Sequence, residues 1–277
     1  MNRLLRPWAL SFVIVATAAF PTRIHAQQND ANLPDSRSPA IQSVEQAHDQ
    51  TSDREESWRA LPRDFFHDQK EIWLFPEQLA RGRHWIPTLG IAAGTAGLIY
   101  ADPHVMPYFR SHATNLDDLN DVFDAYITTG AVAAIPASLM AAGYMRRDQY
   151  EVSTALLAAD AYADSAVVDL AAKAVTRRER PSDIPPGKPF TGTFFNGRMS
   201  PVKGSSFPSG HATGAFSVAA VVASRYRNHR WVPWTVYSFA TVVSLSRITT
   251  LAHFPSDVFA GGALGYTVAR FQTLRPH

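Results

Sequence analysis

Three short groups of residues in this sequence could act together on an anionic substrate. They are Lys173 and Arg180-Pro181, the run Pro208-Ser209-Gly210-His211, and Ser246-Arg247 with His253 and Asp257. The groups provide three cations, two imidazoles and a carboxylate, spread over three separate stretches of the chain. Cations can neutralise phosphoryl oxygens, and an imidazole can act as a nucleophile or as a proton donor.

The third group carries the most specific chemistry. His253 stands just before Pro255-Ser256-Asp257, where we expect the last helix to begin. Asp257 can hydrogen-bond one ring nitrogen of His253 and fix its tautomer, which leaves the other nitrogen free to attack. The planar guanidinium of Arg247 matches the geometry of phosphate oxygens. A single His–Asp pair is weak support, so the prediction depends on all three groups.

The other two groups each have a structural alternative when taken alone. Lys173 and Arg180 lie near one helix end, where cations complement the helix dipole. Ser209 could simply be the N-cap of the Ala-rich run that follows it. A helix start with Gly210 would also form an anion site, because backbone N–H groups point outward and no side chain blocks a ligand.

The rest of the chain predicts an all-α fold. From residue 86 onward it is Ala-rich and apolar, without the alternating pattern of half-buried strands. We expect a bundle of about six apolar helices, with the active site between helix-connecting loops at one end. The six segments are Ile86–Tyr100, Ala125–Met145, Val152–Val175, Ala212–Tyr226, Trp231–Ile248 and Asp257–Phe271. Asp102-Pro103 is among the pairs expected to end a helix, and the acidic stretch Asp117–Asp124 is interpreted as a solvated connection.

The N-terminal region is expected to direct export. Residues 1–26 have a basic start, a short apolar middle and a small residue at the end, which is typical of a signal peptide; an uncleaved anchor is the alternative. Residues 27–63 are polar and predict a flexible tether, and residues 64–277 form the domain. Within it, Phe65 to Trp85 suits an amphipathic helix packed on the domain or at a membrane surface.

Composition excludes several classes of protein. The chain has 277 residues, no cysteine and a formal charge of +2. Cysteine nucleophiles, disulfides and zinc–thiolate sites are therefore ruled out, and no overall basic field indicates a nucleic-acid partner. No cluster of carboxylates and histidines has the spacing of a two-metal phosphatase, so we expect no metal and no cofactor in catalysis.

The three groups resemble the type 2 phosphatidic acid phosphatase superfamily, which includes bacterial acid phosphatases and vanadium haloperoxidases. Its pattern, K-x6-R-P, P-S-G-H and S-R-x5-H-x3-D, is matched at every named position. The resemblance covers roughly Val152 to Phe271, more loosely from Ile86. It implies that His253 is the nucleophile, that Asp257 orients it, and that His211 protonates the leaving alcohol. It also implies that the phosphoryl oxygens are bound by Lys173, Arg180, Arg247, the Ser209 hydroxyl and the Gly210 N–H.

The resemblance implies a metal-independent phosphohydrolase acting on a phosphorylated lipid or a small phosphate ester. The alternatives are a vanadate-dependent haloperoxidase with vanadate in the same pocket, a soluble periplasmic acid phosphatase of broad specificity, and a non-enzymatic scaffold or phosphoryl-ligand binder. The intact imidazoles and Asp257 argue against the last, since binding alone needs only cations.

The sequence allows two interpretations of how the protein is placed relative to a membrane. Several segments approach the roughly 20 residues that span a bilayer, but Asp160, Asp164 and Asp169 lie on the third. We favour an inner-membrane enzyme in which five segments span, Ile86–Tyr100 lies in the interface, and the site faces the periplasm. A soluble periplasmic bundle is the alternative. Asp160 and Asp164 share a helix face, which we interpret as solvated rather than as a border of the substrate pocket.

Overall fold

The computed structural model describes residues 54, 56–113, 117–196 and 204–275. The expected signal peptide, and the expected tether up to residue 53, lie outside these residues. Every element in the described ranges is helical, which confirms the all-α fold class. The elements are α3 (Leu61–Trp73), α4 (Phe75–Ala80), α5 (Trp85–His112), α6 (Asp117–Val122), α7 (Ala125–Arg146), α8 (Gln149–Thr176), η2 (Pro181–Asp183), α9 (Gly210–Arg225), α10 (Trp231–Thr249), α11 (Pro255–Val268) and the π-helical turn η3 (Ala269–Thr273).

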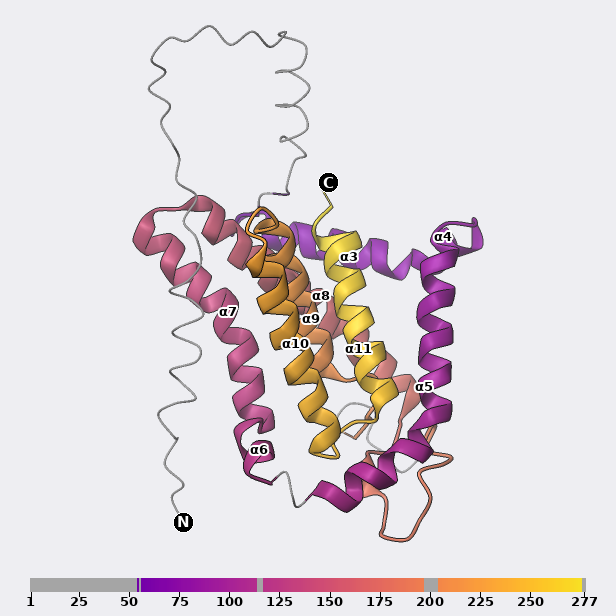
Figure 1. Ribbon diagram of the computed structural model, residues 1–277. Helices are drawn as coiled ribbons and strands as arrows, with labels where there is room; N and C mark the ends of the chain where they lie inside the picture. The colour runs from indigo at the N-terminus through magenta and orange to yellow at the C-terminus, as the bar shows by residue number, and fades with distance from the viewer. Residues whose placement is uncertain (1–53, 55, 114–116, 197–203, 276–277) are drawn as a thin grey trace, which may run out of the picture.

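Helix α9 forms the centre of the bundle. It packs against α8, α10 and α11, while α7 lies against α8 and α5 against α11 (Figure 1). Its core is built from small side chains such as Val221, Val222 and Ala219, all nearly inaccessible to solvent. A Cβ atom on Gly265 of α11 would lie 2.0 Å from the backbone oxygen of Thr213, so only glycine allows these two helices to approach so closely.

Five of the six predicted segments correspond to helices that start and end within a few residues of the expected bounds. The first segment is longer than predicted. Helix α5 does not end at Asp102-Pro103 but continues through Pro103 and Pro107 to His112. A proline inside a helix removes one backbone hydrogen bond and bends the helix without having to end it. Figure 1 shows α5 bending at its lower end.

The amphipathic segment forms two helices, α3 and α4, separated at Leu74. Helix α3 lies across one end of the bundle (Figure 1). It packs on the domain, as expected, but it does so with polar residues. Asp64, Asp68 and Gln69 are buried, whereas Phe66 and Trp73 are more than half exposed.

The polar segment that precedes α3 is ordered before the predicted boundary at residue 63. Arg54 and Glu56 are buried, and the Nη2 atom of Arg54 lies 2.9 Å from Oε2 of Glu56. The backbone N–H of Glu56 donates to the hydroxyl of Ser153 on α8 at 2.8 Å. The expectation of a tether is therefore wrong for these last residues, because the polar face of the bundle offers them partners.

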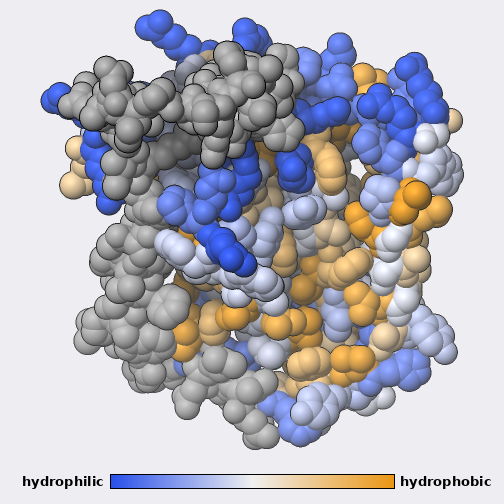
Figure 2. All heavy atoms as spheres, turned by 45° about the horizontal axis from the view of Figure 1, so that its top comes forward, coloured by the Kyte–Doolittle hydropathy of each residue, from blue (hydrophilic) through white to orange (hydrophobic). Residues whose placement is uncertain are grey.

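The described helices give limited support to the expected membrane spans. Among them, α7 alone is long and apolar enough to cross a bilayer by length and composition, and only 17% of its apolar stretch is buried. Helix α5 runs along the bundle, so Ile86–Tyr100 does not form the separate interfacial element that we expected. Figure 2 shows hydrophobic side chains gathering on the flank of the bundle and hydrophilic ones towards the end that α3 crosses. The predicted solvated connection Asp117–Asp124 contains the short helix α6.

Candidate active site

The three predicted groups meet at the end of the bundle opposite α3. The end of α8, the start of α9, the end of α10 and the loop before α11 all lie there (Figure 1). Six of the eight predicted residues line one cavity of about 360 Å³: Lys173, Arg180, Gly210, His211, Arg247 and His253. The two others, Ser209 and Asp257, are completely buried next to it.

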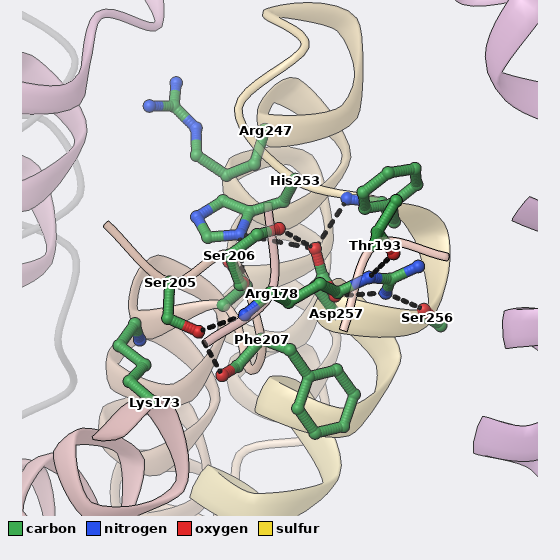
Figure 3. Close-up of polar contacts among 12 residues, drawn as sticks. Lys173, Arg178, Thr193, Ser205, Ser206, Phe207, Arg247, His253, Ser256 and Asp257 are labelled. Atoms are coloured by element: carbon green, nitrogen blue, oxygen red, sulfur yellow. Dashed lines mark hydrogen bonds and ion pairs between the residues drawn. The ribbon is translucent and has the colours of Figure 1, made fainter. Parts of the chain in front are cut away.

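His253 is held in one orientation by a backbone carbonyl. Its Nδ1 atom lies 2.7 Å from the carbonyl oxygen of Ser206, as Figure 3 shows. A carbonyl only accepts, so Nδ1 carries the proton and Nε2 is the unprotonated nitrogen. The sequence analysis assigned this bond to Asp257, but the Oδ2 atom of Asp257 is 3.7 Å from Nδ1. Asp257 instead accepts hydrogen bonds from the hydroxyl of Ser206 and, at 2.8 Å, from the N–H of Phe254.

The surroundings of His253 keep its ring neutral. Burial lowers its pKa below the ordinary value of 6.5, and the positive charges of Arg180 and Lys173 act in the same direction. Asp257 opposes them and raises the pKa, but burial is the larger influence. A neutral imidazole with a fixed tautomer keeps a lone pair on Nε2, which is the requirement for a nucleophile.

His211 also lines the cavity and lies next to α7. Its Nε2 atom is 3.2 Å from the hydroxyl of Thr129 and 3.2 Å from the carbonyl oxygen of Ala125. Burial, together with a smaller contribution from the charge of Arg247, lowers the pKa of His211 to about 4, although the hydrogen bond to the Ala125 carbonyl opposes this shift. An anion bound in the cavity would offset these cations and raise this pKa, which would allow the ring to hold a proton when a substrate is present.

The cations of the cavity are kept in place by neighbours outside the predicted set. The Lys173 ammonium forms an ion pair with Asp169, one helical turn earlier on α8. Asp169 also accepts from the hydroxyl of Thr213 at 3.4 Å. A Cβ atom on Gly210 would lie 3.4 Å from Nζ of Lys173 and 3.3 Å from Oδ2 of Asp169. The backbone at Gly210 therefore approaches the ammonium group closely, as the prediction of an anion site requires.

Ser209 does not act as the side-chain cap that its position would allow. It occupies the N-cap of α9, but its hydroxyl makes no capping bond. This hydroxyl is buried and has no hydrogen-bond partner in the part of the chain that the structure describes. A buried hydroxyl without a partner is costly, so the structural alternative for Ser209 is not supported.

Arg178 is a buried residue that the sequence analysis missed. Its Nη1 atom lies 2.5 Å from Oδ1 of Asp257, and its Nη2 atom lies 2.6 Å from Oδ2 of Asp102 on α5. The hydroxyl of Ser256 lies 2.6 Å from Nη1 of Arg178 and 2.5 Å from Oδ2 of Asp102. We call these four residues the Arg178 network; it connects α5 to the start of α11. Figure 3 shows three of its members, Arg178, Ser256 and Asp257. Asp102 and Arg178 are 76 residues apart in the chain, and no spacing pattern links them.

Comparison with known proteins identifies the region that contains this site. Residues 153–275 match the family described as the PAP2 superfamily. We call residues 153–275 the PAP2 region. The PAP2 region contains all eight predicted site residues and Arg178, while Asp102 lies before it.

Three curated proteins are similar to parts of this chain. The chain is 34% identical over 80 residues to a lipid A 1-phosphatase and 33% identical over 94 residues to a lipid A 4′-phosphatase, both from Porphyromonas gingivalis. It is 39% identical over 67 residues to the bacitracin transport permease protein BcrC of Bacillus licheniformis. These alignments cover 28%, 34% and 24% of this chain. They span 18%, 38% and 32% of the lengths of these three relatives, in the same order.

One solved structure is also similar. It is the crystal structure of a transmembrane PAP2-type phosphatidylglycerolphosphate phosphatase from Bacillus subtilis. The TM-score is 0.40 at 18% sequence identity, over 75% of this chain and 94% of that chain.

Proposed function

We propose that this protein hydrolyses phosphate monoesters of lipids through a phosphohistidine intermediate at His253. The observation that carries the proposal is the fixed, neutral imidazole of His253, which lines a cavity together with three cations. The match of residues 153–275 to the PAP2 superfamily supports the same chemistry.

In the first step, Nε2 of His253 attacks phosphorus and the bond to the ester oxygen breaks. The leaving oxygen takes a proton from His211, so the products are an alcohol and a phosphohistidine. In the second step, His211 accepts a proton from water as the water oxygen attacks phosphorus. The N–P bond breaks, inorganic phosphate is released, and His253 returns to its neutral form.

The remaining residues stabilise charge on the phosphoryl group. Lys173, Arg180 and Arg247 neutralise its oxygens, and the Gly210 N–H and the Ser209 hydroxyl donate hydrogen bonds to them. Phosphoryl transfer depends mainly on in-line positioning and on this neutralisation. We therefore propose that catalysis proceeds without a metal ion.

Two features favour a lipid as the substrate. Besides the cations, the cavity is lined by apolar or aromatic side chains of α7 and α8, among them Val132, Tyr162 and Leu170. Two of the similar proteins are named as lipid A phosphatases. We propose that the phosphate binds at the cations while an acyl chain follows this apolar wall.

Association with a membrane fits the outer surface of the bundle. Trp231 and Trp234 on α10 are 44% and 79% exposed, and Val242 and Leu245 on the same helix are also exposed. Exposed apolar residues that gather on one surface usually mark a site of contact with lipid or protein. We propose that this flank meets lipid, in an exported protein held at the cell envelope.

The test compares purified wild-type protein with His253→Ala in detergent, using a lipid A preparation, phosphatidate and p-nitrophenyl phosphate as substrates. We expect phosphate release by the wild type, at a higher kcat/KM for the lipids, and a loss of at least a thousandfold in His253→Ala. His104→Ala is the matched control, because His104 is exposed on α5 far from the cavity lining. Ordinary turnover by His253→Ala would refute the nucleophile, and a preference for p-nitrophenyl phosphate would favour a soluble-ester phosphatase.

A further inference from the structure

A second group of buried charges lies where α3 crosses the bundle. We call Asp68 of α3 and Asp160 and Asp164 of α8 the acidic cluster; one carboxylate oxygen of each lies within 4.8 Å of the others. All three are at most 2% exposed. Asp160 precedes Lys173 by more than three helical turns, about 20 Å along α8. The acidic cluster is therefore separate from the candidate active site, and the sequence interpretation of Asp160 and Asp164 as a solvated face is wrong.

The nearest cation, Arg54, is shared among several carboxylates. Arg54 makes its closer ion pairs with Asp68 at 2.7 Å and with Glu56 at 2.9 Å. Its distance to Oδ2 of Asp160 is 3.5 Å. Asp164 accepts hydrogen bonds from neutral groups, the Gln69 amide at 2.9 Å and the Thr273 hydroxyl at 3.3 Å. Neither Asp160 nor Asp164 thus has a cation of its own in the part of the chain described here.

The carboxylate of Asp160 is the clearest indication that the acidic cluster binds a ligand. Neither of its carboxylate oxygens forms a hydrogen bond with any described residue, although both are buried. Burial, followed by the neighbouring charge of Asp164, raises the pKa of Asp160 to about 8. Burial likewise raises the pKa of Asp164 to about 7. A buried carboxylate in this situation must be neutralised by a proton or by a cation.

We propose that the acidic cluster binds one divalent cation, Ca²⁺, through carboxylate oxygens of Asp68, Asp160 and Asp164. Calcium prefers oxygen ligands at about 2.3–2.6 Å, so two ligands on opposite sides of the ion are about 5 Å apart. Magnesium needs about 2.0–2.1 Å and a strict octahedron. The three oxygens, which lie within 4.8 Å of one another, fall inside the span of a calcium shell, and its adaptable geometry does not require them to form part of a strict octahedron.

The bound ion would connect three parts of the chain. Asp68 belongs to α3, Asp160 and Asp164 to α8, and Gln272 and Thr273 of η3 bond to Asp68 and Asp164. The ion would therefore fix α3 and η3 on the bundle. This role is structural and independent of the proposed hydrolysis at His253.

The experiment uses the full-length protein after removal of metal with a chelator. Ca²⁺ is titrated while thermal unfolding is recorded, and the bound ion is counted by equilibrium dialysis. We expect one Ca²⁺ per chain and a rise in Tm on the order of 5 °C at a hundredfold excess over Kd. Mg²⁺ at the same concentration should produce a smaller rise.

Two variants test the ligands. Asp160→Asn should abolish the response to Ca²⁺ and raise the Tm of the metal-free protein, because the amide needs no counter-charge. Glu77→Gln is the matched control, since Glu77 is an exposed carboxylate on α4 that pairs with Arg81; it should keep the full response. Asp164→Asn replaces Asp160→Asn if the latter fails to fold.

Several outcomes would overturn the proposal. The site is refuted if the wild type binds no Ca²⁺ while Asp160→Asn still raises the Tm, because Asp160 then carries a proton instead. It is also refuted if the substituted protein binds Ca²⁺ as well as the wild type does. Binding of Mg²⁺ in preference to Ca²⁺ would refute the choice of ion.

Discussion

Two buried ionic networks, each built around one arginine, differ in how completely their carboxylates are paired. In the Arg178 network, every carboxylate oxygen of Asp102 and Asp257 accepts at least one hydrogen bond. In the network around Arg54, neither carboxylate oxygen of Asp160 accepts a hydrogen bond from a described residue. A fully satisfied network holds its members in fixed positions. A network whose carboxylate oxygens lack hydrogen bonds is instead suited to bind a ligand or a proton.

Among the substitutions that test this comparison, a change in the Arg178 network should cause the largest loss of turnover. Arg178→Lys keeps a positive charge but cannot bridge Asp102 and Asp257 at once. We expect kcat to fall about a hundredfold with little change in KM, because Asp257 and the loop that carries His253 lose their support. The free energy of unfolding should fall by about 3 kcal/mol. Steady-state kinetics and urea unfolding measure the two effects.

Two substitutions serve as controls for this change. Arg177→Lys alters the neighbouring arginine, whose side chain donates to the carbonyl of Ala174 and not to a carboxylate of the Arg178 network, and should leave both quantities nearly unchanged. Arg54→Lys should lower stability but not kcat, since Arg54 lies at the other end of the bundle. An unchanged kcat in Arg178→Lys would mean that the network has no positioning role.

Two serines sharpen the comparison within the site. The Ser206 hydroxyl donates to Asp257, whereas the Ser209 hydroxyl has no described partner. Ser206→Ala should therefore lower the free energy of unfolding by about 1–2 kcal/mol. Ser209→Ala should leave stability within about 0.5 kcal/mol of the wild type but lower kcat/KM about tenfold, because a phosphate contact is lost. The reverse pattern, with Ser209→Ala the less stable protein, would remove Ser209 from the phosphate site.

The two regions should also differ in how their stability depends on pH. This is the prediction with the smallest effect on turnover. The folded-state pKa values of His253 and His211 are depressed, so their contribution to stability is present above pH 6.5 and is lost as the pH falls below it. The pKa of Asp160 is raised to about 8. Without Ca²⁺, stability should therefore also fall as the pH rises from about 4 towards 8.

Unfolding in urea at a series of pH values, in the presence of a chelator, checks this prediction. Asp160→Asn should remove part of the loss on the alkaline side and keep the loss on the acidic side. An identical pH profile for the substituted and wild-type proteins would show that Asp160 does not titrate with a raised pKa.

Much of the fold could be predicted from sequence because it depends on local patterns. The apolar runs and their punctuation located α7 to α11 closely. Helix α5 was cut short because Pro103 predicts a stop in isolation, whereas tertiary packing carries the helix through it. The polar face of α3 was not expected to be the buried one, because the sequence does not show that Asp160 and Asp164 of α8 would lie beneath it.

The candidate site, like the fold, could be predicted from sequence only in part. The spacing within each group identified residues that meet at one cavity, although their roles are still proposals. The closer partner of His253, the carbonyl oxygen of Ser206, was not predicted, since a backbone carbonyl leaves no trace in side-chain spacing. Asp102 and Arg178 were missed because their contact joins distant parts of the chain.

The most direct test of the central claim is the stereochemical course at phosphorus. An isotopically chiral phosphate ester is incubated with the enzyme and an acceptor alcohol, and the configuration of the transferred phosphate is determined. Attack by His253 followed by attack of the acceptor involves two in-line displacements, so the account predicts retention of configuration. Inversion would mean a single direct displacement and would contradict a phosphohistidine intermediate.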